Sequence, residues 1–272
     1  IKLSSHPNLN CETAIYAVSK EIKTNYSVFL ADDDILLMDG LVSAVDFLKK
    51  NKTVVGAVGN SYMLGTINNK PFGSINSALN YNLRSYNNIS SLERIKEYFS
   101  DIKALCFAVV NTEIFKESYK ITMNLDEIYQ TYILGENLQA ICYLSKGKII
   151  KLDNEYLIRQ HHKENNYHKI NKKNWLDVNK LNIALKFIKD YAKSQNNIED
   201  CDKIENLLKK YFDKLIINLS VKDKSSFYEK LKKNIPIMMI KYIKYLFFDS
   251  KNVKKFKKTD EVLTYFKIIE HK

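Results

Sequence analysis

The sequence has few of the residues that build a disulfide framework, a zinc ribbon or a membrane span. Its four cysteines, at positions 11, 106, 142 and 201, stand far apart without a C-x-x-C pair, a pattern that fits a reducing compartment. The longest apolar run, residues 235–248, contains two lysines and is too short to cross a bilayer of roughly 30 Å. No basic-then-apolar leader opens the sequence, so we expect no secretion signal. A disulfide-rich secreted domain and an integral membrane protein are therefore not expected.

Glycine is scarce and unevenly placed. All seven glycines of the 272 residues lie before position 150. Residues 1–150 carry 15 basic and 15 acidic side chains, so the net charge of +12 falls entirely on the rest. A long stretch without glycine, rich in Lys, Leu and Ile, is typical of helices. The composition therefore predicts a turn-rich α/β domain over residues 1–165, followed by a basic helical extension over residues 166–272.

The hydrophobic pattern of the first part alternates between strand and helix periods. Buried strands are predicted at residues 26–31, 54–59, 104–110 and 148–152, helices at 41–50, 92–99 and 135–145, and a long loop at 66–90. Strands that alternate with helices favour a mainly parallel sheet flanked by helices. In the second part, apolar stripes predict helices at residues 177–193, 204–219, 236–248 and from 259 onward.

Three consecutive carboxylates, Asp32, Asp33 and Asp34, come directly after the first predicted strand. In an open α/β sheet, ligands bind at the carboxyl ends of strands. Mg²⁺ and Mn²⁺ take oxygen ligands, commonly one or two carboxylates plus substrate phosphates. The triplet is therefore a candidate site for a divalent metal and a diphosphate. Capping of the following helix is the alternative, and it explains one or two of the three aspartates.

The segment from Thr24 to Leu36, followed by Asp39-Gly40-Leu41, resembles the D-x-D segment of GT-A glycosyltransferases, most closely the family-2-like bacterial sugar transferases. Residues 104–113 are similar to the acceptor-side strand of that family. Gly135-Glu136-Asn137-Leu138, with Lys146-Gly147-Lys148, is similar to its G-E-D-L…G-x-K helix. The resemblance covers about residues 6–160 and implies a GT-A-like fold. The family's first strand and nucleotide-base loop are expected to be missing from this chain, which then is a fragment or has an incomplete nucleotide site.

The resemblance implies transfer of a sugar from a nucleotide-sugar donor to an acceptor hydroxyl. It implies Mn²⁺ or Mg²⁺ held by Asp32 and Asp34, with Asp33 facing the donor, although the choice of two aspartates among the three stays open. Glu136 is the candidate base, with a helix-stabilising first-turn carboxylate as the alternative. Asp126 is a second candidate for the catalytic acid–base role, and a solvated or capping carboxylate is again the alternative.

A group of basic and imidazole side chains, Arg159, His161 and His162, follows a strand-like segment at residues 155–158. The resemblance implies that Arg159 and His161 contact the metal or the diphosphate, since guanidinium grips phosphate and imidazole ligates Mn²⁺. A solvated polar group is the alternative for both.

The lysine clusters of the second part are by default the solvated faces of amphipathic helices. A functional alternative is attraction to an anionic membrane surface, worth about 1 kcal/mol per basic residue, which suits a glycan or lipid-linked acceptor. The resemblance implies an enzyme of polysaccharide assembly on the cytoplasmic side, and the membrane alternative for the lysine clusters would make it peripheral on the inner face of the membrane. Two other classes stay open. One is a non-catalytic glycan-assembly subunit. The other is a nucleic-acid-binding protein. The sequence contains no nucleic-acid recognition motif, however, and this function would leave the three aspartates unexplained.

Overall fold

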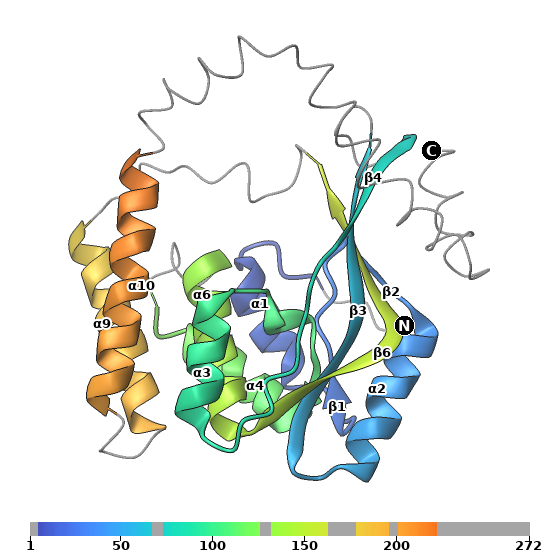
Figure 1. The fold of residues 1–272 in the computed structure, drawn as a ribbon, viewed down its shortest axis with the longest axis horizontal. Coiled ribbons are helices and arrows are strands. Elements are labelled where there is room, and N and C mark those ends of the chain that lie inside the picture. Colours follow the sequence, from blue (N-terminus) through green and yellow to red (C-terminus); the bar gives the residue numbers. More distant parts are fainter. Residues whose placement is uncertain (1–4, 67–72, 126–131, 163–177, 196–200, 222–272) are drawn as a thin grey trace.

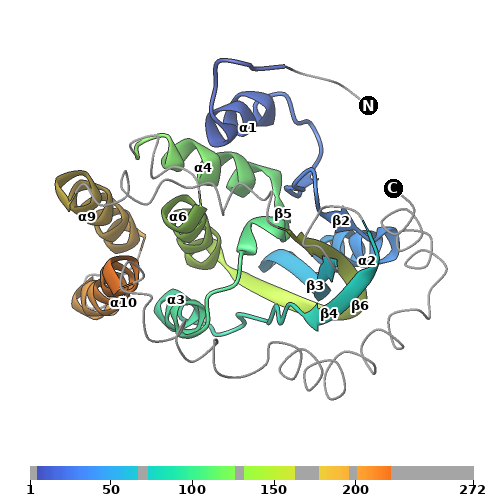
Figure 2. The same ribbon diagram turned by 90° about the horizontal axis from the view of Figure 1, so that it is seen from above.

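The computed structural model describes residues 5–66, 73–125, 132–162, 178–195 and 201–221. Its strands form one sheet, with α2 on one face and α3, α4 and α6 on the other (Figures 1 and 2). The helices are α1 (Cys11–Ser19), α2 (Met38–Lys50), α3 (Ser91–Ser100), the 3₁₀ turn η1 (Leu105–Phe107), α4 (Thr112–Thr122), α6 (Tyr132–Lys146), α9 (Val178–Ser194) and α10 (Cys201–Val221). The strands are β1 (Tyr26–Ser27), β2 (Ile35–Leu36), β3 (Val54–Thr66), β4 (Ile75–Asn80), β5 (Val109–Asn111) and β6 (Lys148–His161).

Five predicted helices are confirmed as α2, α3, α6, α9 and α10. The strand predictions fare less well. The segment 104–110 forms the turn η1 before β5, because its apolar side chains are buried on all sides and show no period that separates strand from turn. The predicted loop at 66–90 contains β4, and the predicted strand at 26–31 pairs only over β1. The helices predicted at 236–248 and from 259 lie outside the described residues.

The expectation of a mainly parallel, GT-A-like sheet is wrong. The sheet is mixed, mostly antiparallel and curled (Figure 1). Its strand order is β1-β5-β3-β6-β2, with β4 paired to β3. Among the described strands, β3 and β6 alone pair in parallel, whereas β1–β5, β2–β6, β3–β4 and β3–β5 are antiparallel. Continuous apolar runs indicate a strand covered on both faces. Helices cover both faces here as well, so the runs carry no information about strand direction.

Helix α2 lies unusually close to β6. A Cβ added at Gly40 would stand 2.2 Å from the carbonyl oxygen of Glu155 and 2.7 Å from Cα of Tyr156. Just before the helix, the backbone N–H of Leu37 donates to the carbonyl of Tyr156 at 2.8 Å. This contact fixes the chain that follows the three aspartates against the middle of β6.

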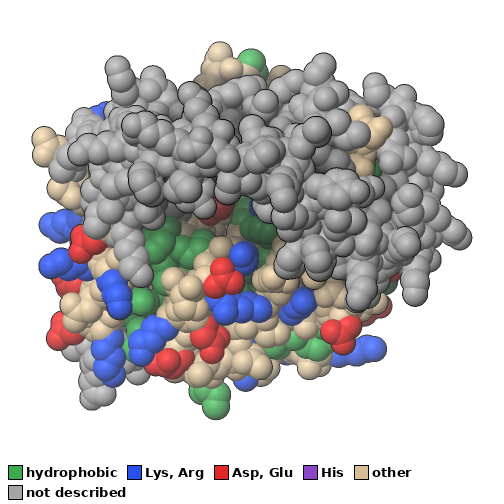
Figure 3. Space-filling model, turned by 45° about the horizontal axis from the view of Figure 1, so that its top comes forward, with side chains coloured by type: hydrophobic (Ala, Val, Ile, Leu, Met, Phe, Trp, Pro, Cys, Tyr) green, Lys and Arg blue, Asp and Glu red, His purple; other side chains and the backbone are tan. Residues whose placement is uncertain are grey.

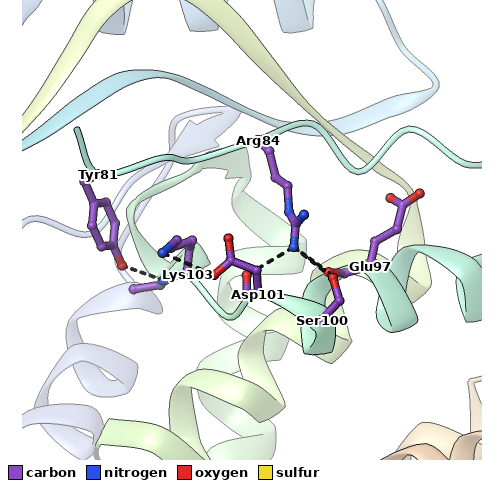
Figure 4. Close-up of polar contacts among 7 residues, drawn as sticks. Tyr81, Arg84, Glu97, Ser100, Asp101 and Lys103 are labelled. Atoms are coloured by element: carbon purple, nitrogen blue, oxygen red, sulfur yellow. Dashed lines mark hydrogen bonds and ion pairs between the residues drawn. The ribbon is translucent and has the colours of Figure 1, made fainter.

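Arg84 holds the segment after β4 against the end of α3, as Figure 4 shows. Its Nη2 donates to the carbonyls of Glu97 (2.8 Å) and Asp101 (3.3 Å) and to Oγ of Ser100 (3.1 Å). The last carbonyls of a helix lack partners within the helix, and a cation there is favoured by the helix dipole. Arg84 therefore fixes the loop that carries Tyr81, which becomes important at the site below.

Helices α9 and α10 belong to the same hydrophobic core as the sheet. Their buried side chains, among them Leu181, Ile188 and Leu208, pack in one cluster with residues of α3, α4 and α6. The ring of Tyr211 on α10 stands 4.9 Å from that of Phe99 on α3. The proposed domain boundary at residue 165 stays a prediction. Within the described part of the chain, no helix is long and apolar enough to cross a membrane.

The close approach of α2 to β6 predicts a stability effect with an unusual sign. An exposed helical Gly→Ala change stabilises a protein by up to about 1 kcal/mol. We expect Gly40→Ala instead to destabilise the fold by about 1–3 kcal/mol, because the new methyl overlaps backbone atoms that cannot move aside. Urea denaturation measures the change, and Val42→Ala on the exposed face of α2 should stay within about 0.5 kcal/mol of wild type. A stabilised Gly40→Ala protein would contradict the close packing.

Candidate functional site

The pairing of β2 with β6 brings the three aspartates to the end of β6. After β1, the chain runs extended and turns at Asp32 and Asp33, and the N–H of Asp34 donates to the carbonyl of Ala31 at 3.2 Å. In the ladder, Ile35 stands opposite Ile158. The next pair outward along this antiparallel ladder is Asp34 and Arg159, so the register itself sets them face to face.

Asp34 and Arg159 form a buried ion pair. Arg159 Nε donates to Asp34 Oδ2 at 3.3 Å, and the backbone N–H of Gln160 donates to Asp34 Oδ1 at 3.1 Å. The Asp34 side chain is only 2% exposed. Burial raises the pKa of Asp34 to about 6, although Arg159 opposes the shift. Both carboxylate oxygens of Asp34 are therefore already engaged by the protein.

The Arg159 guanidinium lies against two aromatic rings. It stands 4.5 Å from the ring centre of Phe107 and 5.0 Å from that of Tyr81, within range of cation–π attraction. The hydroxyl of Tyr81 accepts a hydrogen bond from the backbone N–H of Ala104 at 2.8 Å, which fixes the ring. The aromatic pair and Asp34 together hold Arg159 in one orientation.

His162 pairs with Asp33. Its Nε2 lies 3.2 Å from Asp33 Oδ2, and the His162 side chain is 7% exposed against 22% for Asp33. The other ring nitrogen, Nδ1, is buried without a hydrogen-bond partner. The predicted histidine, His161, is an exposed residue at the last position of β6. Of the two adjacent histidines, the structure thus brings His162 to the acidic triplet.

Glu136 enters the site from α6. The residue is half-buried, with the buried Gly135 and Asn137 on either side. Burial raises the pKa of Glu136, and the charge of Arg159 opposes that shift. A carboxyl group with a raised pKa close to a candidate ligand site has the property required of a general base. The predicted alternative, Asp126, lies outside the described residues.

Asn137, at the position where the resemblance expects a second acid, has a structural role. Its Oδ1 accepts from the hydroxyl of Tyr98 at 2.9 Å, and its Nδ2 donates to the hydroxyl of Tyr211 at 3.3 Å. Successive helical residues point about 100° apart. Glu136 and Asn137 therefore serve different surfaces, and Asn137 joins α3, α6 and α10 behind the site.

Glu12, on α1, is a neighbour of the site that the sequence did not indicate. It is half-buried, and its Oε2 atom is buried without a hydrogen-bond partner. Burial, together with the charge of Glu136, raises the pKa of Glu12 to about 7, although a hydrogen bond from the backbone of Glu12 itself opposes the shift. A glutamate in the first turn of a helix is ordinary, so nothing in the sequence distinguishes it from a stabilising surface residue.

The predicted metal ligands do not lie equally open. Asp32 is exposed, whereas Asp34 is buried against Arg159. Within the described ranges, no three His, Cys, Asp or Glu side chains gather as a metal-binding group. Mg²⁺ can be held by only one or two carboxylates when phosphates complete its shell. Asp32 and the partly exposed Asp33 fit that donor set better than Asp34 does.

A separate pocket of about 490 Å³ opens elsewhere in the fold. It is lined by the chain before β1, the start of β3 and the junction of β5 with α4. The start of β3 lies beside the start of β6, so the pocket is at the opposite end of these strands from the last residues of β6. The pocket shares no lining residue with the acidic site, so it is not part of the arrangement described above.

No protein-family model matches the sequence, and a search of curated proteins finds no match. The function is therefore argued from the chemistry of the site.

The raised pKa of Glu12 predicts a pH-dependent effect of Glu12→Gln. The folded protein holds this proton more tightly than the unfolded chain, so ionisation costs stability as the pH rises from about 4.5 to about 7. We expect Glu12→Gln to stabilise the protein at pH 8 by on the order of 1–3 kcal/mol, seen as a Tm higher by several degrees. The gain should shrink at pH 5.

The matched control for this measurement is Glu113→Gln. Glu113 lies on α4 with 80% of its side chain exposed, so its replacement should change the Tm little at either pH. The interpretation fails if Glu12→Gln shifts the Tm by the same amount at pH 5 and pH 8.

Proposed function

We propose that the protein is a metal-dependent glycosyltransferase that moves a sugar from a nucleoside-diphosphate sugar to an acceptor hydroxyl. One observation carries the proposal. Three segments distant in the sequence are linked through Arg159: its guanidinium pairs with Asp34 of the aspartate triplet, it lies at the end of β6 near the Asp33–His162 pair, and its charge opposes the raised pKa of Glu136 on α6. Two of these segments are the ones that resemble glycosyltransferase motifs, and the third supplies the basic group expected beside them. The proposal rests on this chemistry and not on the sheet, whose topology differs from the expected one.

The donor side is assigned to Asp32 and Asp33, which would hold Mn²⁺ or Mg²⁺. The metal supplies positive charge that stabilises a diphosphate leaving group. His162 orients Asp33 through its Nε2 contact, as outer groups commonly orient metal-binding carboxylates. Arg159 adds a fixed positive charge close by and keeps the buried Asp34 ionised enough to anchor the loop.

The acceptor side is assigned to Glu136. An acceptor hydroxyl must lose its proton as it bonds to the anomeric carbon, and a base within hydrogen-bond reach accelerates that step. A carboxylate whose pKa is raised toward neutrality by burial binds the proton more strongly than an exposed one. Glu136 therefore has the protonation behaviour that this step requires.

The remaining parts of the proposal concern location and acceptor. We place the enzyme in the cytoplasm, peripheral on the inner face of the membrane, with a glycan or lipid-linked acceptor. The positive charge of residues beyond 150 supports this location. A nucleic-acid-binding function has less support: the sequence carries no recognition motif, and on the described part of the face in Figure 3 basic and acidic side chains are interspersed.

Calorimetric titration tests the metal–diphosphate assignment directly. We expect UDP or GDP to bind wild-type protein only with Mn²⁺ present, and Asp33→Asn to weaken that binding roughly tenfold or more (about 1.4 kcal/mol) because an oxygen ligand is lost. Asp39→Asn is the matched control, since Asp39 is an exposed aspartate in the first turn of α2. Binding of neither nucleotide would contradict the assignment of Asp32 and Asp33 as a metal–diphosphate site in this chain.

The assignment of the base predicts a different kinetic effect. With a panel of UDP- and GDP-sugars, we expect Glu136→Gln to lower the rate of sugar transfer or donor hydrolysis by roughly 10²–10⁴-fold. Metal-dependent binding of UDP or GDP should stay unchanged, because Glu136 contacts the acceptor and not the diphosphate. The rate is measured as the release of UDP or GDP from the donor sugar. An unchanged rate in a folded Glu136→Gln variant would exclude Glu136 as the base.

A further inference from the structure

The pocket of about 490 Å³ lies where α2 ends and β3 begins, at the lower end of the molecule in Figure 1. Its volume falls within the range of small-molecule binding sites. Part of its lining is apolar and includes Leu48, Val54 and Val55. The polar part comes from the chain before β1 and from the junction of β5 with α4. The proposed function uses none of these residues.

Two lysines from different segments line this pocket. Lys23 precedes β1, Lys52 lies in the turn between α2 and β3, and both residues are exposed. Within the described ranges, neither side chain forms an ion pair. The acid of the lining, Glu113, already has a cation, because its Oε1 lies 3.0 Å from Nζ of Lys116. The pocket therefore has positive charge that no carboxylate of the described fold balances.

The neutral polar groups of the lining are fixed by the fold. The backbone N–H of Thr112 donates to the carbonyl of Asn25 at 3.0 Å, which joins the chain before β1 to the start of α4. Asn111 caps α4, since its Oδ1 accepts from the N–H of Glu113 at 2.9 Å. This cap uses the acceptor of the Asn111 amide, and its Nδ2 donates to no group among the described residues. The pocket thus offers hydrogen-bond donors as well as positive charge.

We propose that this pocket binds a sugar phosphate, with the phosphate on Lys23 and Lys52 and the sugar ring against Val54 and Val55. A phosphate monoester carries a charge of about −1.5 to −2 at pH 7 and has three acceptor oxygens. It therefore matches two lysines and an amide donor. Phosphate alone is far smaller than the pocket, so the ligand has an organic part, and the carbon face of a sugar fits the apolar lining.

The same phosphate chemistry could come from a lipid headgroup, but the surroundings of the pocket favour a soluble ligand. Basic segments that bind a membrane surface place large apolar side chains beside their lysines. None of the exposed large hydrophobic residues of the described chain lines the pocket. The inference does not rest on the proposed function, because the pocket lies at the opposite end of β3 and β6 from the acidic site.

The test is an NMR titration of ¹⁵N-labelled full-length protein with glucose 6-phosphate. EDTA is present, so that no metal can recruit phosphate to the acidic site. We expect the amide signals of Asn25 and Thr112 to shift with the concentration of glucose 6-phosphate, and those of Asp33 and His162 to stay unchanged. Glucose, which lacks the phosphate, should shift neither set.

Variants of the lysines test the contact with phosphate. We expect Lys23→Gln and Lys52→Gln each to weaken binding by roughly threefold to tenfold, because a charged donor is lost. Lys52→Arg keeps the charge and should bind within about twofold of wild type. The matched control is Lys49→Gln, since Lys49 is a nearby lysine on α2, 61% exposed and outside the lining. It should also leave the affinity within about twofold of wild type.

Several results would overturn the inference. Absence of shifts at millimolar glucose 6-phosphate is one, and equal weakening in Lys49→Gln and Lys52→Gln is another. Lysine-dependent binding to phosphatidylglycerol vesicles without binding of glucose 6-phosphate would reassign the pocket to a lipid headgroup. The titration needs no donor, acceptor or metal. Binding at the pocket in a protein without transferase activity would therefore reject the proposed function alone.

Discussion

The contact between Asp34 and Arg159 is the constraint on which the site depends. The two residues are 125 positions apart in the sequence, and the antiparallel register of β2 on β6 sets them opposite each other. Both side chains are largely removed from water, where a buried ion pair adds little net stability but leaves a costly charge when one partner is lost. Its value here is positional. With Asp34 held against Arg159, Asp33 lies within reach of His162 and Asp32 faces solvent.

The surroundings of the site are built to keep this arrangement rigid. Arg84 closes the end of α3 and fixes the loop that carries Tyr81, and Tyr81 with Phe107 sets the plane of Arg159. On α6, Asn137 ties the helix to Tyr98 and Tyr211, one residue away from Glu136. The helices α9 and α10 thus support the candidate base from behind, since they pack in the same core.

Some of this structure could be predicted from the sequence and some could not. Amphipathic period identifies α2, α3 and α6 because their apolar stripes face one side only. Strand direction was predicted wrongly, since burial on both faces gives the same apolar run in a parallel or a mixed sheet. Two residues that the motif order selected, Asp34 and Arg159, form an ion pair, whereas the assignment of the triplet, Glu136 and Arg159 to one functional site stays a prediction. The sequence could not distinguish His162 from His161. Side chains of adjacent residues at the end of a strand point in opposite directions, and the register of the sheet decides which of the two points toward the aspartates. Nothing in the sequence marked Glu12 as unusual, because its raised pKa comes from burial in the folded chain.

The negative charge of the site can be balanced in more than one way. Its carboxyl groups outnumber its permanent cations, since Arg159 stands against Glu12, Asp32, Asp33, Asp34 and Glu136. Exposed carboxylates can be balanced by a metal ion that arrives with phosphate, whereas a buried one is balanced by a cation, as Asp34 is by Arg159, or by a proton. The position of each group in the fold decides which applies. Asp32 is exposed and Asp33 partly exposed, which suits a metal, while the half-buried Glu136 has a raised pKa, which suits a proton. A site divided in this way separates the charge of a leaving diphosphate from the proton of an attacking hydroxyl, which is the division that sugar transfer requires.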